Sequence, residues 1–407
     1  MAALREAGVA ATDRRTIALI AAGLGAFAPS LPRADGTLDF KFLHYGESDD
    51  RTQVANPELF WQQDFGERGQ LGLLLGYDAI SGASPTGEVP SLDAASGASA
   101  SASDIPMVEY SDTRQAATGS YSLRLGSHLP SVSLSVSEEE DYLSRGGSLS
   151  DAWDLFDRRS TLHFGAGITR DRIEPVNMTE TFHKEGTSLS VGWTQVLGPR
   201  DLIDLSYGME SLEGYLTDPY KLVTVGDVTM MEVRPEHRRR QSALIKYGHY
   251  FLSRGASKIA YRYYRDDWKV RAHTLDLTHD QRMGDHFILT PRVRLYQQDG
   301  AEFFAYEFAE SQEHMSSDYR LSAFWSWLAG IGFTVEINDH FAFNLSGTYM
   351  DQTGDDRVTP RTTVVAPPAI AVAALEEDED EEDDGPGDLS PADMQVVTVV
   401  AGFSIRY

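Results

Sequence analysis

The sequence predicts an all-β fold, one antiparallel up-and-down transmembrane β-barrel of about 16 strands. Three observations predict this fold. Apolar and polar residues alternate along most of the chain, tight turns alternate with long polar loops, and the last strand ends on an aromatic residue. Alternation gives each strand one apolar and one polar face. Because a bilayer cannot satisfy unpaired backbone groups, such strands span it only as a closed barrel with the apolar face toward lipid.

Residues 1–34 are predicted to be a signal peptide. Arg14 and Arg15 precede the apolar segment 16–28, which is followed by small residues. This order of basic, apolar and small residues is typical of export signals. The alternative interpretation is a short N-terminal core helix. With export, residues 35–407 form a single barrel domain, and we expect it in the bacterial outer membrane.

The predicted strands are separated by connections that alternate in length. In 201–210, for example, Ile203, Leu205 and Tyr207 alternate with polar residues. Short periplasmic turns and long external loops are expected, with both chain ends on the short-turn side. The long loop 81–112 is expected to fold inward and narrow the lumen. The predicted strands are 38–45, 57–65, 69–80, 113–127, 130–141, 142–154, 160–172, 186–197, 201–213, 238–252, 256–267, 270–283, 286–298, 317–336, 340–352 and 394–407.

The closing strand and the aromatic residues favour a membrane barrel over a soluble sandwich or propeller. Val397, Val399 and Phe403 share a face with the terminal Tyr407, as in strands that the barrel-assembly machinery handles, so that machinery is an expected partner. Aromatic residues near strand ends are expected to form girdles next to outer-membrane lipid and lipopolysaccharide. They are Tyr121, Tyr247, Tyr319, Trp325, Trp327 and Tyr349.

Composition narrows the functional classes. The chain of 407 residues has no cysteine, which excludes disulfides, a cysteine nucleophile and cysteine-ligated metals. Its 62 acidic and 35 basic residues give a net charge of −27, which argues against binding nucleic acid. Nine of the acidic residues form the run Glu376–Asp384, within a loop at about 353–393 that is predicted to be disordered. The mean hydropathy of −0.33 suits a barrel in which half of each strand faces a polar lumen.

Seven motifs in order resemble a family of bacterial outer-membrane barrels known only as domain of unknown function 3570. They are Tyr77-Asp-Ala-Ile-Ser-Gly-Ala-Ser-Pro85, Ser137-Glu-Glu-Glu-Asp-Tyr142, Gly214-Tyr-Leu-Thr-Asp-Pro-Tyr220, Arg234-Pro-Glu-His-Arg238, Tyr261-Arg-Tyr-Tyr-Arg-Asp-Asp-Trp268, Pro291-Arg-Val-Arg-Leu-Tyr-Gln297 and Ser317-Asp-Tyr-Arg-Leu321. The resemblance covers about 38–350 and the closing strand, whereas 353–393 is particular to this chain. It implies a barrel in the cell envelope, brings no catalytic residue, and points to periplasmic redox proteins as partners.

Two groups of polar residues are candidate functional sites. The first lies on the polar parity of the strands and is expected to line the lumen, where charges set the selectivity of a pore or pair and close it. Its members are Arg124, Lys246, Arg262, Asp276, Arg292, Arg294, Arg320 and Glu336, with Glu139 and Asp280 on the same parity. The second is expected at the external rim: Ser81, Gly82, Pro85, Asp218, Pro219, Tyr220, Asp266, Asp267 and Trp268. The simpler interpretation of the rim residues is that they order the loops.

The predicted function is a pore or transport conduit for small solutes or ions. One alternative is a closed barrel that serves as a scaffold for an envelope flavoprotein or redox system. A second is a hydrolase at the rim, for which His44, His183, His273 and His314 are the available histidines. No nucleophile elbow, phosphate loop or zinc-type spacing accompanies them, so no enzymatic activity, cofactor or metal is expected. The acidic cluster Glu138–Asp141 lacks the spacing of a calcium loop.

Overall fold

The computed structural model describes residues 35–66, 68–89, 91–93, 105–356, 361–363 and 390–407. The predicted signal peptide, residues 1–34, and the acidic run Glu376–Asp384 lie outside these residues. In the described part of the chain, no helix has the length and apolar content needed to cross a membrane.

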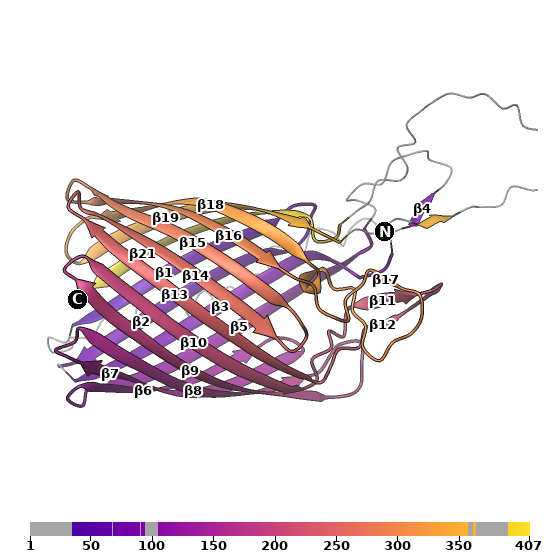
Figure 1. Cartoon of the computed structure of the whole chain (residues 1–407), viewed down its shortest axis with the longest axis horizontal. Coiled ribbons are helices and arrows are strands. Elements are labelled where there is room, and N and C mark those ends of the chain that lie inside the picture. Colours follow the sequence, from indigo (N-terminus) through magenta and orange to yellow (C-terminus); the bar gives the residue numbers. More distant parts are fainter. Residues whose placement is uncertain (1–34, 67, 90, 94–104, 357–360, 364–389) are drawn as a thin grey trace, which may run out of the picture.

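The described residues form a closed antiparallel barrel of sixteen strands (Figure 1), which confirms the predicted fold class. Neighbours in the barrel are neighbours in the sequence, and β21 pairs with β1 to close it. The strands are β1 (Gly36–Glu47), β2 (Gln53–Phe65), β3 (Gly69–Pro85), β5 (Met107–Leu123), β6 (His128–Glu138), β7 (Tyr142–Leu155), β8 (Ser160–Ile173), β9 (Phe182–Gly198), β10 (Asp201–Gly214), β13 (His237–Phe251), β14 (Gly255–Asp266), β15 (Arg271–Met283), β16 (Phe287–Gln298), β18 (Phe324–Glu336), β19 (Phe341–Gly354) and β21 (Met394–Arg406).

Only short turns join the described strands at one end of the barrel. The longer loops lie at the other end, the loop end, together with the short turns 139–141 and 267–270. The first strand starts beside the C-terminus, where the Gly36 amide donates to the Tyr407 carbonyl at 2.9 Å. At the loop end, β11 (Leu222–Val225), β12 (Val228–Met231) and β17 (Glu307–Phe308) form a small sheet that extends beyond the barrel (Figure 1). The segments β4 (Ser91–Asp93) and β20 (Arg361–Thr363) pair with each other there.

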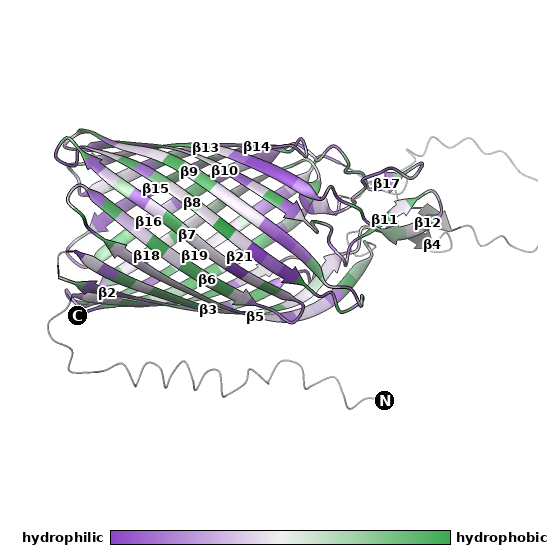
Figure 2. Cartoon of the chain, turned by 90° about the horizontal axis from the view of Figure 1, so that it is seen from below, coloured by the Kyte–Doolittle hydropathy of each residue, from purple (hydrophilic) through white to green (hydrophobic). Residues whose placement is uncertain are grey.

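Strand register separates an apolar outer face from a polar inner face. Residues paired across strands share a face, and apolar side chains such as Leu134, Leu149 and Ile168 are 68%, 65% and 56% exposed on the outer one. Figure 2 shows the resulting alternation of hydrophobic and hydrophilic residues along the strands. A soluble protein rarely exposes so much apolar surface, whereas a membrane barrel requires it.

The structure corrects the predicted strand 317–336. Its first part is instead a short 3-10 helix, η2 (Tyr319–Leu321), and the strand starts at Phe324. The helix forms because the Asp318 side chain accepts a hydrogen bond from the Arg320 amide at 3.1 Å, which caps its first turn. Tyr319 is consequently 7% exposed inside the loop end and does not belong to an aromatic girdle. The other five predicted girdle residues lie on the outer face. Four of them have an apolar register partner, whereas Trp325 lies opposite Gln297 and Thr353.

Candidate functional site

The inner wall of the barrel is basic on β13 to β16 and lined by small neutral residues in the middle of β6 to β9. On the described strands β13 to β16, eight basic and three acidic side chains face the lumen: Arg238, Arg240, Lys246, Lys258, Arg262, Arg282, Arg292 and Arg294 against Asp266, Asp276 and Asp280. On β6 to β9 the middle of the wall carries serine, glycine and threonine, as in the register pairs Ser133–Ser148 and Gly167–Ser188. The lumen is therefore electrostatically asymmetric.

Seven of the predicted lumen residues lie on this inner wall: Lys246, Arg262, Asp276, Asp280, Arg292, Arg294 and Glu336. Asp276 accepts hydrogen bonds from both Arg292 (2.6 Å) and Arg294 (2.8 Å), so one carboxylate serves two guanidinium groups. Lys246 and Arg262 are exposed to the lumen and have no hydrogen bond or ion pair with any residue that the structure describes. The middle of the wall thus carries unneutralised positive charge.

The other predicted lumen residues lie elsewhere. Arg124 follows β5 at the turn end, where it donates to Asp154 at 2.9 Å. Glu139 lies in the turn between β6 and β7. Arg320 belongs to η2, in the loop between β16 and β18, because its segment does not continue the barrel wall. Its guanidinium contacts Asp318 and Asp218 in the mouth, by which we mean the lumen opening at the loop end.

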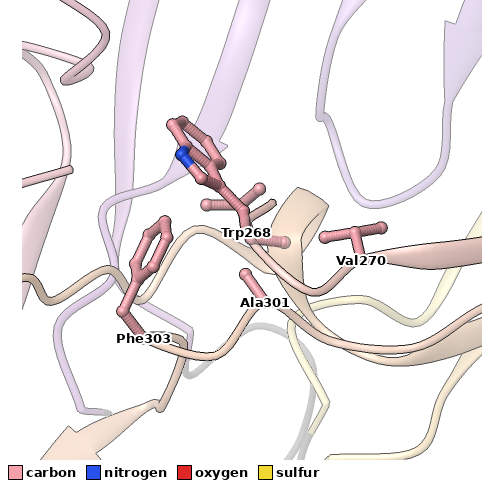
Figure 3. Close-up of a cluster of buried hydrophobic side chains, with 5 residues drawn as sticks. Trp268, Val270, Ala301 and Phe303 are labelled. Atoms are coloured by element: carbon pink, nitrogen blue, oxygen red, sulfur yellow. The ribbon is translucent and has the colours of Figure 1, made fainter. Parts of the chain in front are cut away.

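The mouth contains its own apolar core. Trp268 and Val270, from the turn between β14 and β15, pack against Ala301, Phe303 and Leu321 (Figure 3). The Trp268 and Phe303 rings meet edge to face at 5.1 Å. A second cluster of Val223, Phe308 and Met315 joins β11 to β17. Segments 215–236 and 299–323 therefore supply the packed mouth. The loop 81–112 was predicted to fold inward and narrow the lumen. Its described part instead lies against β11, where the Leu222 amide donates to the Thr86 carbonyl at 2.8 Å.

Four consecutive residues, Asp218 to Lys221, tie the loops together across the mouth; we call them the crossbar. Asp218 accepts from Arg320 at 2.7 Å, and the Pro219 carbonyl accepts from Asn177 at 2.9 Å. Tyr220 donates to Asp141, and Lys221 donates to Ser84 Oγ at 2.6 Å and to the Pro85 carbonyl. Lys221 belongs to the loop after β10, whereas Ser84 lies near the end of β3, six strands away around the barrel. The crossbar therefore spans the mouth.

A buried network of charges supports the crossbar. Asp318, 2% exposed, accepts from Arg234 at 2.8 Å and from Arg320 at 2.6 Å. Glu232, 1% exposed, contacts Arg234 at 2.6 Å and accepts from Ser316 at 2.5 Å. Removing one partner from such a network leaves an uncompensated buried charge, at a cost of about 3–5 kcal/mol.

The environment shifts the pKa values of the ionisable groups in this network. Burial alone would raise the pKa of Asp318, but Arg320 and Arg234 outweigh it and hold that pKa far below its usual range. Burial raises the pKa of Glu232 in spite of Arg234 and lowers the pKa of Lys221. Burial and the hydrogen bond to Asp141 raise the pKa of Tyr220 to about 12. Tyr220 therefore remains a hydrogen-bond donor throughout the physiological range.

A cavity of about 320 Å³ lies between this network and the lumen wall. It is lined by Arg234, Arg238, Arg262, Tyr264, Val270, Tyr296, Gln298, Asp318, Arg320 and Leu321. Arg238 forms an ion pair with Asp266 (2.5 Å), and its guanidinium carbon lies 4.1 Å from the centre of the Trp268 ring. Arg234, Arg238, Arg320 and Lys221 are balanced by Asp218, Glu232, Asp266 and Asp318. Arg262 is the surplus cation.

The structure brings most of the predicted rim residues together. Pro85 meets the crossbar through Lys221, and Asp266 and Trp268 position Arg238 at the cavity. Asp267 instead accepts from the Arg239 amide at 2.9 Å, away from the cavity. The sequence alone did not indicate five further site residues: Lys221, Glu232, Arg234, Arg238 and Asp318. Two of the seven motifs, 234–238 and 317–321, contained three of them, but the second motif was assigned to a strand.

Gly82 has a structural role at the rim, next to Ser81 where β2 and β3 stop pairing. Its φ is +137°, and a Cβ there would lie 2.2 Å from the Arg51 carbonyl oxygen. We expect Gly82→Ala to destabilise the folded barrel by about 2–3 kcal/mol, because the backbone is strained and must also move. Heat-modifiable gel mobility after stepwise heating measures the loss. Gly76→Ala, on the same strand with no atom within 4 Å, is the control; equal effects of the two substitutions would contradict this account.

Three carboxylates from Asp112, Glu139 and Asp141 offer oxygens within 4.8 Å of one another near the mouth. Burial, with the nearby Asp112, raises the pKa of Glu139. Asp141 already accepts the Tyr220 hydroxyl, so the cluster is part of the loop network. We assign no metal site to it.

Comparison with known proteins identifies the family. A family model described as "Protein of unknown function (DUF3570)" matches residues 16–362. The chain belongs to this family. No curated protein matches this DUF3570 protein.

Solved structures with a similar barrel include a bacterial polysaccharide outer membrane secretin (8% identity, 91% of this chain and 98% of that chain, TM-score 0.49). Another is the CymD monoaromatic hydrocarbon channel (10% identity, 92% and 89%, TM-score 0.42). A third is the siderophore receptor PirA from Acinetobacter baumannii (11% identity, 81% and 54%, TM-score 0.44), of which the DUF3570 protein spans about half the length. We derive no solute from these likenesses.

Proposed function

We propose that this DUF3570 protein is an outer-membrane conduit for small anionic solutes, with a mouth gated by interlocked loops. The observation that carries the proposal is the surplus of cations in the middle of the lumen wall from β10 to β16. Lys246, Arg262, Arg292 and Arg294 there face the two carboxylates of Asp204 and Asp276, which leaves two positive charges. This surplus stands out in a chain whose net charge is −27. Charged side chains that line a pore select ions of the opposite sign.

The mouth cavity extends the same electrostatic path toward the loop end. Arg262 belongs both to the wall and to the cavity, so an anion attracted into the cavity would pass directly to the basic wall. Guanidinium groups suit this task because they present several N–H donors to carboxylate or phosphate oxygens. The crossbar above the cavity would control entry.

Ion selectivity tests the proposal. Purified protein in planar bilayers under a potassium chloride gradient is expected to pass current with a chloride-over-potassium permeability ratio above unity. The variant Lys246→Gln/Arg262→Gln removes both unpartnered cations and is expected to bring the ratio close to unity. Arg254→Gln, in a turn between β13 and β14, is the control and should behave as the wild type. Cation preference of the wild type would contradict an anion conduit.

The second candidate function is a sealed barrel that serves as a scaffold for periplasmic redox proteins. The packed mouth and its crossbar favour this candidate. Absence of current both from the wild type and from a variant without the crossbar would favour the scaffold. Co-purification with a flavoprotein or a thioredoxin-like protein would then identify the partner class.

A further inference from the structure

Three arginines lie on the outer face of the barrel at the loop ends of β13, β14 and β15. The strand register places Arg265 opposite both Gln241 and Arg271, and Arg239 shares their outward parity on β13. Along the strands, from the loop end toward the middle of the barrel, the next pair on the outer face is Tyr263–His273, and the one after it is Tyr261–Leu275. The arginines therefore lie just beyond the aromatic residues that mark the edge of the apolar outer band. We call Arg239, Arg265 and Arg271 the outer arginine patch.

The patch has no acidic partner within the described residues. Arg265 donates from Nε and Nη2 to the neutral amide oxygen of Gln241, at 3.0 and 2.9 Å. The side chains of Arg239 and Arg271 are exposed and make no hydrogen bond or ion pair with any residue that the structure describes. Asp267, in the adjoining turn, is directed to the Arg239 backbone amide and to His237.

Several other arginines of the described barrel have an acidic partner. On the outer face, Arg170 lies opposite Glu185, with Nε and Oε1 3.3 Å apart. On the inner side of β13 and β14, Arg238 has Asp266. Like charges directly opposite each other on a sheet destabilise it. A bound anion would remove the repulsion between Arg265 and Arg271, and no acidic residue of the described chain pairs with them.

We propose that the outer arginine patch binds the phosphate groups of lipids in the external leaflet of the membrane. The patch lies at the height where the apolar band ends and lipid headgroups begin. Guanidinium groups match phosphate oxygens in geometry and charge, and arginines near an anionic membrane surface each contribute about 1 kcal/mol to binding. This inference is independent of what passes through the lumen.

Binding of a phosphorylated lipid tests the proposal. We would titrate the detergent-solubilised, full-length protein with bisphosphorylated lipid A and count bound lipids by native mass spectrometry. The variant Arg265→Gln/Arg271→Gln is expected to bind about 30-fold more weakly, which corresponds to about 1 kcal/mol for each arginine. Arg170→Gln, which removes an outer arginine that has an acidic partner, is the control and should bind as the wild type does.

A second comparison needs no substitution. Wild-type protein should bind bisphosphorylated lipid A more tightly than the same lipid with both phosphates removed, and added salt should narrow the difference. Equal affinity for the two lipids would overturn the proposal, as would equal binding by the double variant with unchanged heat-modifiable mobility. Neither outcome depends on conductance, so failure here and failure of the conduit proposal are distinguishable.

Discussion

Asp318→Asn is expected to raise the rate of tryptic cleavage within the mouth loops by on the order of 100-fold. The Asp318 carboxylate is 2% exposed and holds both Arg234 and Arg320. An asparagine keeps the shape but leaves the guanidinium groups without that negative charge. For Arg234, whose side chain is 11% exposed, the loss amounts to about 3 kcal/mol. When opening is faster than cleavage, the cleavage rate follows the free energy of opening.

The measurement is limited trypsin digestion of the purified barrel, with cleavage after Lys221 and Arg320 followed by mass spectrometry. Asp280→Asn is the control, because the Asp280–Lys258 pair (2.9 Å) is 32% and 56% exposed and such a pair contributes about 1 kcal/mol or less. Unchanged heat-modifiable mobility would show that the barrel remains closed in both variants. Cleavage of Asp318→Asn at the wild-type rate would mean that the apolar cluster alone holds the loops.

Removal of the crossbar side chains is expected to increase single-channel conductance several-fold. The variant Asp218→Leu/Tyr220→Phe/Lys221→Met removes the ties to Arg320, Asp141 and Ser84 while keeping side-chain size approximately. Because these ties connect loops from different sides of the barrel, their loss should free the mouth without disturbing the strands. Planar-bilayer recordings measure the change, and swelling of proteoliposomes in solutions of sugars of increasing size measures the opening.

The control for the crossbar variant changes exposed side chains of the same loop. Val228 and Met230 on β12 are 60% and 41% exposed, so Val228→Thr/Met230→Thr should leave conductance unchanged. Equal conductance of the crossbar variant and the wild type would contradict the gating role. A rise in both variants would show that any change in this loop opens the mouth.

The barrel itself was predictable because its determinants are local. Alternation such as Ile203, Leu205 and Tyr207 fixes which residues face lipid, and each turn joins strands that pair with each other. Register then places Lys246, Arg262 and Asp276 on the lumen face without further information. Arg320 is the exception, because the Asp318 cap forms a short helix there and the strand begins only after it.

The mouth was not predictable because its contacts join residues that are far apart in the sequence. Lys221 reaches Ser84 and Pro85, and Arg51 lies 5.6 Å from the centre of the Tyr319 ring. No periodic pattern encodes such pairs. Glu232, Arg234 and Asp318 form a buried charge network only when these loops meet and exclude water from them.

By itself, the sequence determined an antiparallel barrel, its faces and the basic residues of its wall, because a period of two is a property of each strand alone. Only the tertiary structure decided how the loops close over the lumen, which arginine is left without an acidic partner in the cavity, and which arginines are left without one on the outer face. These are questions of charge balance among distant segments, and that balance exists only once the barrel has brought the segments together.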